Sequence, residues 1–275
     1  MTAARLALPD THDWRIAGEA WGARSTDWAY LWEPYSRPAN DLLLQRLGVG
    51  RGTRMIDVAC GSGFAARLAS ERGAEVTGLD ASDALVAIAR ARTPEGDFRV
   101  GTMFKLPFAD GSFDVVTTFN GIWKGCDAAL AEAHRVLAPG GRLGMTFWGS
   151  PARMGLLPVF AKALELSPPS HQHATLEQGT TGRSGVAEQM LTSAGFTVRE
   201  RGTVDVTNEW PDVATAVRAL LAAGPVMPAI DNVGLEAFRE AMTEVVAPTY
   251  IPGIGVRITS ELGWITADAA TGGQR

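Results

Sequence analysis

Two hydrophobic periods alternate along the middle of this chain. Short apolar runs rich in β-branched residues are separated by segments whose apolar residues recur every third or fourth position, as in amphipathic helices. The run 113–119 is apolar almost throughout, which is typical of a strand buried on both faces. Strands that alternate with helices predict a parallel sheet with right-handed crossovers. The predicted strands are 55–59, 75–79, 98–100, 113–119 and 142–148, and the predicted helices are 64–71, 82–92 and 128–137.

The two flanks of this regular region have other patterns. Trp14, Trp21 and Trp28 follow one another at intervals of seven residues, a spacing that places them on one face of a helix. Such an aromatic face either packs on the core or forms a lid over a ligand. A further helix is predicted at 38–47. After residue 150 the predicted helices are 155–166, 186–194, 213–223 and 235–246, the predicted strands are 197–206 and 256–267, and 167–184 is a long polar loop.

The first predicted strand leads into a glycine turn. Residues 55–64 read Met-Ile-Asp-Val-Ala-Cys-Gly-Ser-Gly-Phe, so Gly61 and Gly63 stand between a strand and a helix. Glycines at such a turn let a ligand approach the backbone closely, and the free N–H groups of the helix start face that ligand. The same letters also satisfy the loose G-x-G-x-x-[GA] pattern of dinucleotide-binding proteins, so the loop alone leaves the cofactor open.

Polar and glycine residues follow several other predicted strands. Asp80 follows the second strand, Gly101-Thr102 the third, and Asn120-Gly121 the fourth. Because ligands of open α/β sheets bind beyond the carboxyl ends of the strands, we expect these positions to converge with Gly61 on one site.

Composition and charge limit the possible partners. A net charge of −5 gives no reason to expect binding to nucleic acid or to an anionic membrane. Two cysteines, Cys60 and Cys126, indicate no disulfide framework and fit a reducing compartment. The chain shows neither a signal-peptide pattern nor an apolar run of the roughly 20 residues that a membrane helix needs. We therefore expect a soluble, cytoplasmic protein.

Several ordered motifs together resemble the class I S-adenosylmethionine-dependent methyltransferases, in their ubiquinone/menaquinone-biosynthesis-like small-molecule branch. The matching segments are the acid-x-x-x-G-x-G run 57–63, Asp80, the run Leu-Pro-Phe-Ala-Asp-Gly-Ser-Phe-Asp-Val-Val at 106–116, Glu-Ala-His-Arg-Val-Leu-Ala-Pro-Gly-Gly at 132–141, and Ala-Gly-Phe at 194–196. The resemblance is tight over about residues 52–150. It implies a Rossmann-like α/β fold with a seven-stranded sheet of order 3-2-1-4-5-7-6, in which the last strand is antiparallel.

The resemblance also implies an organisation into three parts. Residues 1–50 form a helical, aromatic-rich N-terminal lid, and residues 51–150 form the Rossmann-like core that binds the cofactor. Residues 151–275 supply substrate-covering helices and the last two strands, which complete the same domain.

The resemblance implies S-adenosyl-L-methionine as cofactor and S-adenosyl-L-homocysteine as product, without a metal. Asp80 is expected to accept hydrogen bonds from both ribose hydroxyls. Thr102 stands where many relatives carry an acid, and a neutral hydroxyl is a weaker acceptor for the adenine amino group. The full predicted cofactor set is Asp57, Ala59, Cys60, Gly61, Gly63, Asp80, Ala81, Thr102, Met103 and Asn120.

Candidates for the acceptor side and for catalysis are fewer. Trp21, Trp28 and Trp123 are candidate walls for the substrate. Packing on the core is the favoured alternative for Trp21 and Trp28, and loop packing is the alternative for Trp123. His171 and His173 are weak candidates for a general base. His-x-His with no third ligand near it in sequence does not predict a metal site.

The resulting hypothesis is an enzyme of class EC 2.1.1.-, a small-molecule methyltransferase. It would transfer the methyl group to an oxygen, nitrogen or carbon of a small, apolar or aromatic metabolite, without nucleic-acid or membrane partners. One alternative is a methyltransferase-like protein that binds the cofactor without methyl transfer, as a cyclase or a binding module. A weaker alternative is an NAD-dependent oxidoreductase, which leaves the runs 106–108 and 139–141 unexplained. The sequence does not predict the oligomeric state.

Overall fold

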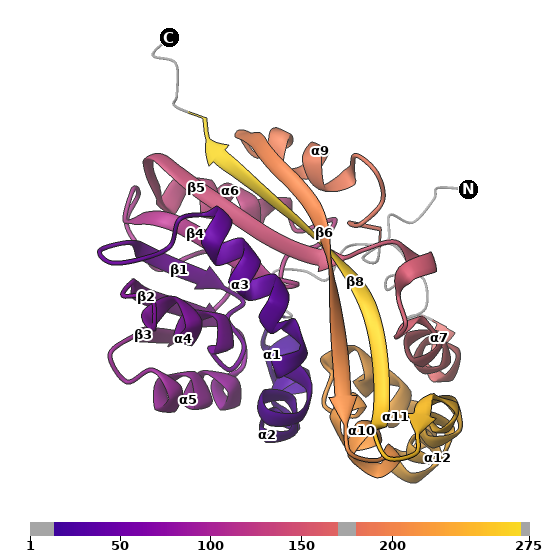
Figure 1. Ribbon diagram of the computed structural model, residues 1–275. Coiled ribbons are helices and arrows are strands. Elements are labelled where there is room, and N and C mark those ends of the chain that lie inside the picture. The colour runs from indigo at the N-terminus through magenta and orange to yellow at the C-terminus, as the bar shows by residue number, and fades with distance from the viewer. Residues whose placement is uncertain (1–13, 170–179, 271–275) are drawn as a thin grey trace, which may run out of the picture.

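The computed structural model describes residues 14–169 and 180–270, which form one eight-stranded sheet flanked by helices (Figure 1). The strand order is β3-β2-β1-β4-β5-β8-β6, and a short strand, β7, pairs with β8 off this path. Strands β1 to β5 run parallel, whereas β8 is antiparallel to both β5 and β6. The predicted order is therefore confirmed, with β8 as the seventh strand and β7 as an unpredicted addition. The strands are β1 Arg54–Val58, β2 Glu75–Asp80, β3 Asp97–Val100, β4 Phe113–Phe119, β5 Leu137–Trp148, β6 Phe196–Trp210, β7 Tyr250–Ile251 and β8 Gly255–Ala269.

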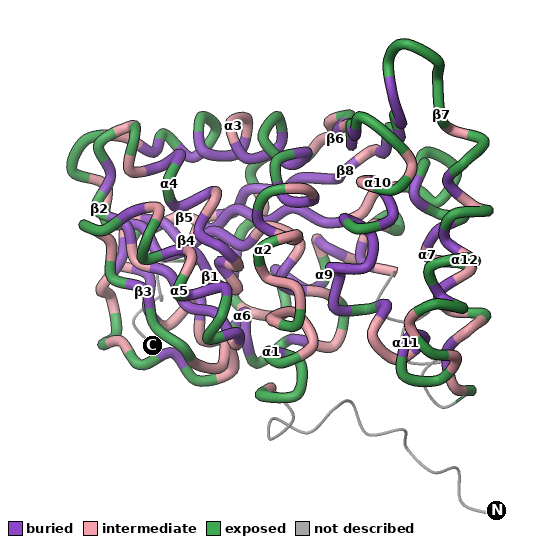
Figure 2. The backbone as a smooth tube through the Cα atoms, turned by 90° about the horizontal axis from the view of Figure 1, so that it is seen from below, coloured by how far each residue is buried: buried purple, intermediate pink, exposed green. Residues whose placement is uncertain are grey.

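Each face of the sheet has its own apolar core. Successive side chains of a strand point to opposite faces, so neighbouring apolar residues serve different cores. Met55 and Val115 pack with helices α3, α4 and α5, while Ile56 and Val116 pack with α6 and α9. Figure 2 shows the strands buried between helices whose outer sides are exposed. These helices are α3 Arg37–Arg46, α4 Phe64–Ser70, α5 Asp83–Arg92, α6 Asp127–Val136 and α9 Val186–Ser193.

Strands β6 and β8 are longer than their neighbours and carry a third apolar cluster. The last residue of β5, Trp148, pairs with Leu262, and β8 continues past that point as the partner of β6. Figure 1 shows this extension running to α10, α11 and α12, with α7 beside it. The elements around it are η4 Pro151–Arg153, α7 Leu157–Leu166, α10 Val213–Leu220, η5 Gly224–Val226, α11 Met227–Val233, α12 Leu235–Val246 and η6 Ala247–Thr249.

The N-terminal aromatic segment is not one helix. It is broken after Gly22, a poor helix former, and the spacing of seven residues therefore does not produce a single aromatic face. The break lets the chain turn across the carboxyl ends of the strands. Gly18 packs so closely on the backbone after β2 that a Cβ there would lie 2.1 Å from the carbonyl oxygen of Ala81. The elements are α1 Trp14–Gly22, α2 Ser25–Asp27, the π-helix η2 Trp28–Trp32 and the 3-10 helix η3 Glu33–Ser36.

No single helix of the described residues combines the length and apolarity needed to cross a membrane. Taken together, the segments Val213–Leu220 and Gly224–Val233 have the length and apolar composition of a membrane span, but they are bent by 87° at the break between them.

Candidate functional site

The glycine loop joins β1 to α4 through backbone conformations that most side chains avoid. Gly61 and Gly63 have φ angles of 54° and 74°, and Ala59 also has a positive φ, of 60°. At Gly63 a Cβ would lie 2.7 Å from the Cβ of Ala89, so this position is closed to a side chain by space as well as by conformation. The loop therefore presents backbone rather than side chains to the carboxyl end of the sheet.

Asp80 ties this loop to the end of β2. One carboxylate oxygen accepts the N–H of Gly61 at 2.8 Å, and the other accepts the N–H of Ser82 at 2.8 Å. Burial raises the pKa of Asp80, and these backbone hydrogen bonds partly offset that effect. Each carboxylate oxygen keeps capacity for another donor. The structure thus brings Gly61, Asp80 and Ala81 together, as the sequence predicts, and leaves Asp80 able to accept two more hydroxyl groups.

A second buried acid lies near the end of β1. Asp57 is 2% exposed and accepts a hydrogen bond from the Thr117 hydroxyl at 2.8 Å. Burial raises the pKa of Asp57 to about 8, and the negative charges of Glu33 and Asp80 add to this rise. Asp57 therefore holds its proton at neutral pH unless a positive charge is placed beside it.

Asn120 connects the end of β4 to the N-terminal segment. Its φ of 55° is unusual outside glycine, and its N–H donates to the carbonyl of Thr146 at 3.2 Å. Its amide nitrogen donates to the Tyr35 hydroxyl at 3.3 Å. Tyr35 stacks on Trp148 with ring centres 6.1 Å apart, and burial raises the pKa of its phenol, which keeps it protonated. The predicted residue Asn120 is therefore positioned by groups from two other elements.

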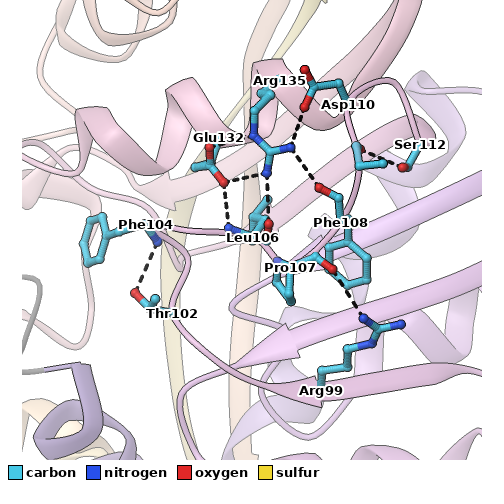
Figure 3. Close-up of polar contacts among 11 residues, drawn as sticks. Arg99, Thr102, Phe104, Leu106, Pro107, Phe108, Asp110, Ser112, Glu132 and Arg135 are labelled. Atoms are coloured by element: carbon cyan, nitrogen blue, oxygen red, sulfur yellow. Dashed lines mark hydrogen bonds and ion pairs between the residues drawn. The ribbon is translucent and has the colours of Figure 1, made fainter.

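The loop between β3 and β4 is held by an arginine of α6 (Figure 3). Arg135 donates to the carbonyls of Leu106 and Phe108 at 2.9 and 2.8 Å and pairs with Glu132 at 2.7 Å. Glu132 in turn accepts the N–H of Leu106 at 2.7 Å. This network explains physically why an acid and an arginine follow the Leu-Pro-Phe run in the sequence.

Two residues of the predicted cofactor set, Thr102 and Met103, lie at the start of that loop. The Thr102 hydroxyl accepts the N–H of Phe104 at 3.3 Å, and Met103 packs against the core formed with α6 and α9. Their roles toward adenine stay predictions.

Sequence reasoning missed a buried ion pair beside the glycine loop. Glu33 of η3 accepts a hydrogen bond from the Ser62 hydroxyl and pairs with Arg92 at 2.8 Å. Burial raises the pKa of Glu33, whereas Ser62 and Arg92 act in the opposite direction. Arg92 also donates to the carbonyl of Ala29 at 2.7 Å, which fixes the N-terminal segment to α5. An acid inside an aromatic stretch was the one available signal, but its partners lie far away in the sequence.

Seven aromatic side chains gather between the N-terminal segment and the extension of the sheet. The rings of Trp28 and Trp32 stack with centres 5.7 Å apart, and Trp21 meets Trp28 edge-on at 4.7 Å. Trp123 packs instead with the core of α6 and α9, so the structure does not bring it together with the other two candidate substrate residues. The aromatic cluster consists of Trp21, Trp28, Trp32, Tyr35, Trp148, Phe160 and Trp210.

The candidate bases and metal ligands are less informative. His171 and His173 lie outside the described residues. Within residues 14–169 and 180–270, no group of three or more His, Cys, Asp or Glu side chains is arranged to hold a metal ion.

The residues present fit a cofactor that carries ribose hydroxyls and positive charge. Asp80 offers paired acceptors, the glycine loop offers open backbone, and burial, with a smaller contribution from Glu33 and Asp80, raises the pKa of Asp57 to about 8. A cationic ligand beside Asp57 would favour its ionised form. A neighbouring donor, the indole Nε1–H of Trp28, is buried and has no partner among the described residues.

Comparisons with known proteins agree with this geometry. Residues 56–145 match the family model described as a methyltransferase domain. A demethylmenaquinone methyltransferase from Listeria monocytogenes is 32% identical over 176 residues, which cover 56% of this chain and 73% of that protein. Another from Beutenbergia cavernae is 38% identical over 110 residues, 39% of this chain and 46% of that protein. The match thus spans less than half of the length of the Beutenbergia protein and of two similar relatives, and about three quarters of the Listeria protein.

The fold itself has a counterpart of known structure. A putative methyltransferase from Bacillus halodurans superposes with a TM-score of 0.58 at 18% identity, covering 85% of this chain and 100% of that one. The strand order, the methyltransferase-domain match and the Listeria relative lead to one conclusion. This chain belongs to the class I S-adenosylmethionine-dependent methyltransferase family.

Proposed function

We propose that this protein transfers a methyl group from S-adenosylmethionine to an oxygen, nitrogen or carbon atom of a small molecule. The observation that carries the proposal is the Asp80 carboxylate, which the N–H groups of Gly61 and Ser82 hold rigidly beside the glycine loop. A carboxylate so placed at the end of the second strand is the group that binds ribose hydroxyls in nucleotide-binding sheets. The bound cofactor supplies an already activated methyl group on a sulfonium.

The protein contributes binding and alignment to this reaction. Asp80 would hold the ribose, the loop 59–63 would approach the amino-acid portion, and Ala81 and Met103 would flank the adenine. Asp57 would balance the positive charge of the cofactor, which favours its ionised form. Holding the acceptor in line with the methyl carbon converts a bimolecular encounter into a unimolecular step, which lowers the barrier by several kcal/mol.

We propose an apolar or aromatic acceptor that also carries a polar atom. The aromatic cluster supplies the apolar wall, and residues 1–50 and 151–275 would cover the core 51–150. On the inner face of the β6 extension, Asn208 is 1% exposed, and neither amide atom has a partner among the described residues. A buried amide without partners is costly, so an oxygen or nitrogen of the acceptor is a reasonable partner for it. The relatives' name, demethylmenaquinone methyltransferase, is compatible with an acceptor of this kind.

Calorimetry on wild type and Asp80→Asn would test the cofactor assignment. We expect S-adenosylmethionine and S-adenosylhomocysteine to bind the wild type, and the variant to lose at least about tenfold in affinity, because hydrogen bonds to a charged group contribute about 1.5–3 kcal/mol. Asp97→Asn is the matched control, because Asp97 is an exposed acid on β3 paired with Arg99. Binding of NAD alone would overturn the assignment.

A methylation screen would then test the reaction. Naphthoquinols, phenols and aromatic amines are incubated with the protein and labelled S-adenosylmethionine, and transfer of label is measured. We expect transfer to at least one apolar aromatic compound. Cofactor binding without transfer to any compound would favour the binding-module alternative.

A further inference from the structure

The indole edge of Trp28 faces the glycine loop. A Cβ built on Gly61 would lie 3.6 Å from the indole nitrogen, Nε1. The ring itself is held by Trp21 and Trp32, one edge-on and one stacked. The Nε1–H is buried and has no partner among the described residues, although a buried indole N–H normally finds an acceptor. Ring packing therefore explains the position of Trp28 but leaves its donor unexplained.

Glu33 presents an acceptor to the same point of the loop. Its Oε2 atom receives the Ser62 hydroxyl and the Arg92 guanidinium, so the side chain is fixed. Its Oε1 atom lies 3.2 Å from the position that a Cβ of Gly61 would take. A donor from Trp28 and an anionic acceptor from Glu33 therefore stand side by side above Gly61.

We propose that these two side chains bind the amino-acid end of the cofactor, an inference that rests on the proposed function. A zwitterionic tail needs one donor for its carboxylate and one acceptor for its ammonium group. Trp28 Nε1–H would donate to the carboxylate, and Glu33 Oε1 would accept from the ammonium group. The N-terminal segment is then part of the cofactor site. The Nε1–H of Trp28 contacts the cofactor, while its ring belongs to the apolar wall on the acceptor side.

Three thioether nucleosides that carry no sulfonium charge separate these roles. S-Adenosylhomocysteine carries both charged groups of the tail, its decarboxylated analogue carries only the ammonium group, and 5′-methylthioadenosine carries neither. Their affinities are measured by calorimetry for wild type, Trp28→Phe and Glu33→Gln. Trp264→Phe is the matched control, since Trp264 is a buried tryptophan of β8 that packs with the core of α3, α4 and α5.

The proposal predicts a selective pattern. Trp28→Phe lowers the affinity for S-adenosylhomocysteine about tenfold and leaves the other two ligands within twofold, because a lost hydrogen bond to a charged group is worth about 1.5–3 kcal/mol. Glu33→Gln weakens both ammonium-bearing ligands and spares 5′-methylthioadenosine. The control changes none of the three affinities. The N–H resonance of Trp28 is the indole resonance that is absent from the NMR spectrum of Trp28→Phe. In the wild type this resonance shifts with S-adenosylhomocysteine and not with 5′-methylthioadenosine. This readout does not depend on the affinity of the variant.

Other outcomes overturn the inference separately from the function. If Trp28→Phe loses affinity equally for all three ligands, or for none of them, the indole N–H does not bind the tail. An indole resonance that responds equally to the two nucleosides means the same. If the wild type binds none of the adenosyl ligands, the proposed function itself fails.

Discussion

Different kinds of contact hold the two ends of the candidate site, the cofactor end around the glycine loop and the acceptor end around the aromatic cluster. At the cofactor end, arginine side chains bond backbone carbonyls: Arg90 donates twice to Phe98, Arg92 to Ala29, and Arg135 to Leu106 and Phe108. At the acceptor end, around the extension of β6 and β8, the described contacts are chiefly apolar and aromatic.

The difference follows from what each end is proposed to bind. Directional bonds to carbonyls fix loop positions, which a cofactor of constant shape requires, because pre-organised groups need no rearrangement on binding. Apolar packing tolerates substitutions that conserve side-chain volume. The acceptor end can therefore adapt to different acceptors without disturbing the cofactor end. Three variants would break or sharpen this comparison.

The largest effect is expected for Arg135→Met. The variant keeps an apolar stem but loses the bonds to two carbonyls and to Glu132, so the free energy of unfolding should fall by about 2–3 kcal/mol. Urea denaturation measures this change, and the cofactor affinity should fall with it because the loop that carries Thr102 and Met103 loosens. Arg67→Met is the control, since Arg67 is an exposed residue of α4 whose ion pair with Glu71 contributes little. If both variants lowered the free energy of unfolding equally, Arg135 would not be the residue that holds this loop in place.

An intermediate effect is expected on the pH dependence of stability. The pKa of Asp57 is 3.8 in its ordinary state and about 8 in the folded protein, so between these values the folded state holds a proton that the unfolded chain has lost. The free energy of unfolding should therefore decrease as the pH rises from 5 to 8, and Asp57→Asn should remove roughly 2 kcal/mol of that decrease. Burial raises the pKa of Glu33 and Asp80 as well. In Asp57→Asn the free energy of unfolding should therefore still decrease as the pH rises, but less steeply than in the wild type.

Urea denaturation at both pH values measures this slope. Asp114→Asn is the control, because Arg54 lowers the pKa of Asp114 and its contribution is lost only as the pH falls below the ordinary value of 3.8. An unchanged slope in Asp57→Asn would show that folding does not raise the pKa of Asp57.

The smallest effect is expected at the apolar end. Asn208→Leu replaces a buried amide without described partners by an apolar side chain of similar size, so the free energy of unfolding should rise by about 1 kcal/mol. Thermal and urea unfolding measure it. Asn232→Leu is the control, since it removes a hydrogen bond to the Leu166 carbonyl and should not stabilise the protein. A loss of stability in Asn208→Leu would mean that the amide serves the fold rather than the acceptor.

Much of the cofactor end was predictable because its determinants are local. The strand–turn–helix around Gly61 and Gly63, the Ser82 cap of α5 and the acid at the end of β2 each depend on a few consecutive residues. The predicted turn at 139–141 lies inside the bounds of β5 as an irregularity, where Gly140 has a φ of 76° and the pairing with β4 passes from Leu137 directly to Arg142. The local turn signal is therefore kept within the strand.

The alternation of periods in the sequence predicted the parallel strands, and the resemblance of its motifs to the methyltransferase family implied the order of the sheet and identified Asp80 and the glycine loop. Only the tertiary structure decided what lies above that loop. The break after Gly22 sets the direction of the N-terminal segment, and with it the meeting of Glu33, Ser62 and Arg92 and the placement of the Trp28 edge beside Gly61. Such contacts join residues far apart in the chain, and they depend on how helices pack rather than on any periodic or neighbouring pattern.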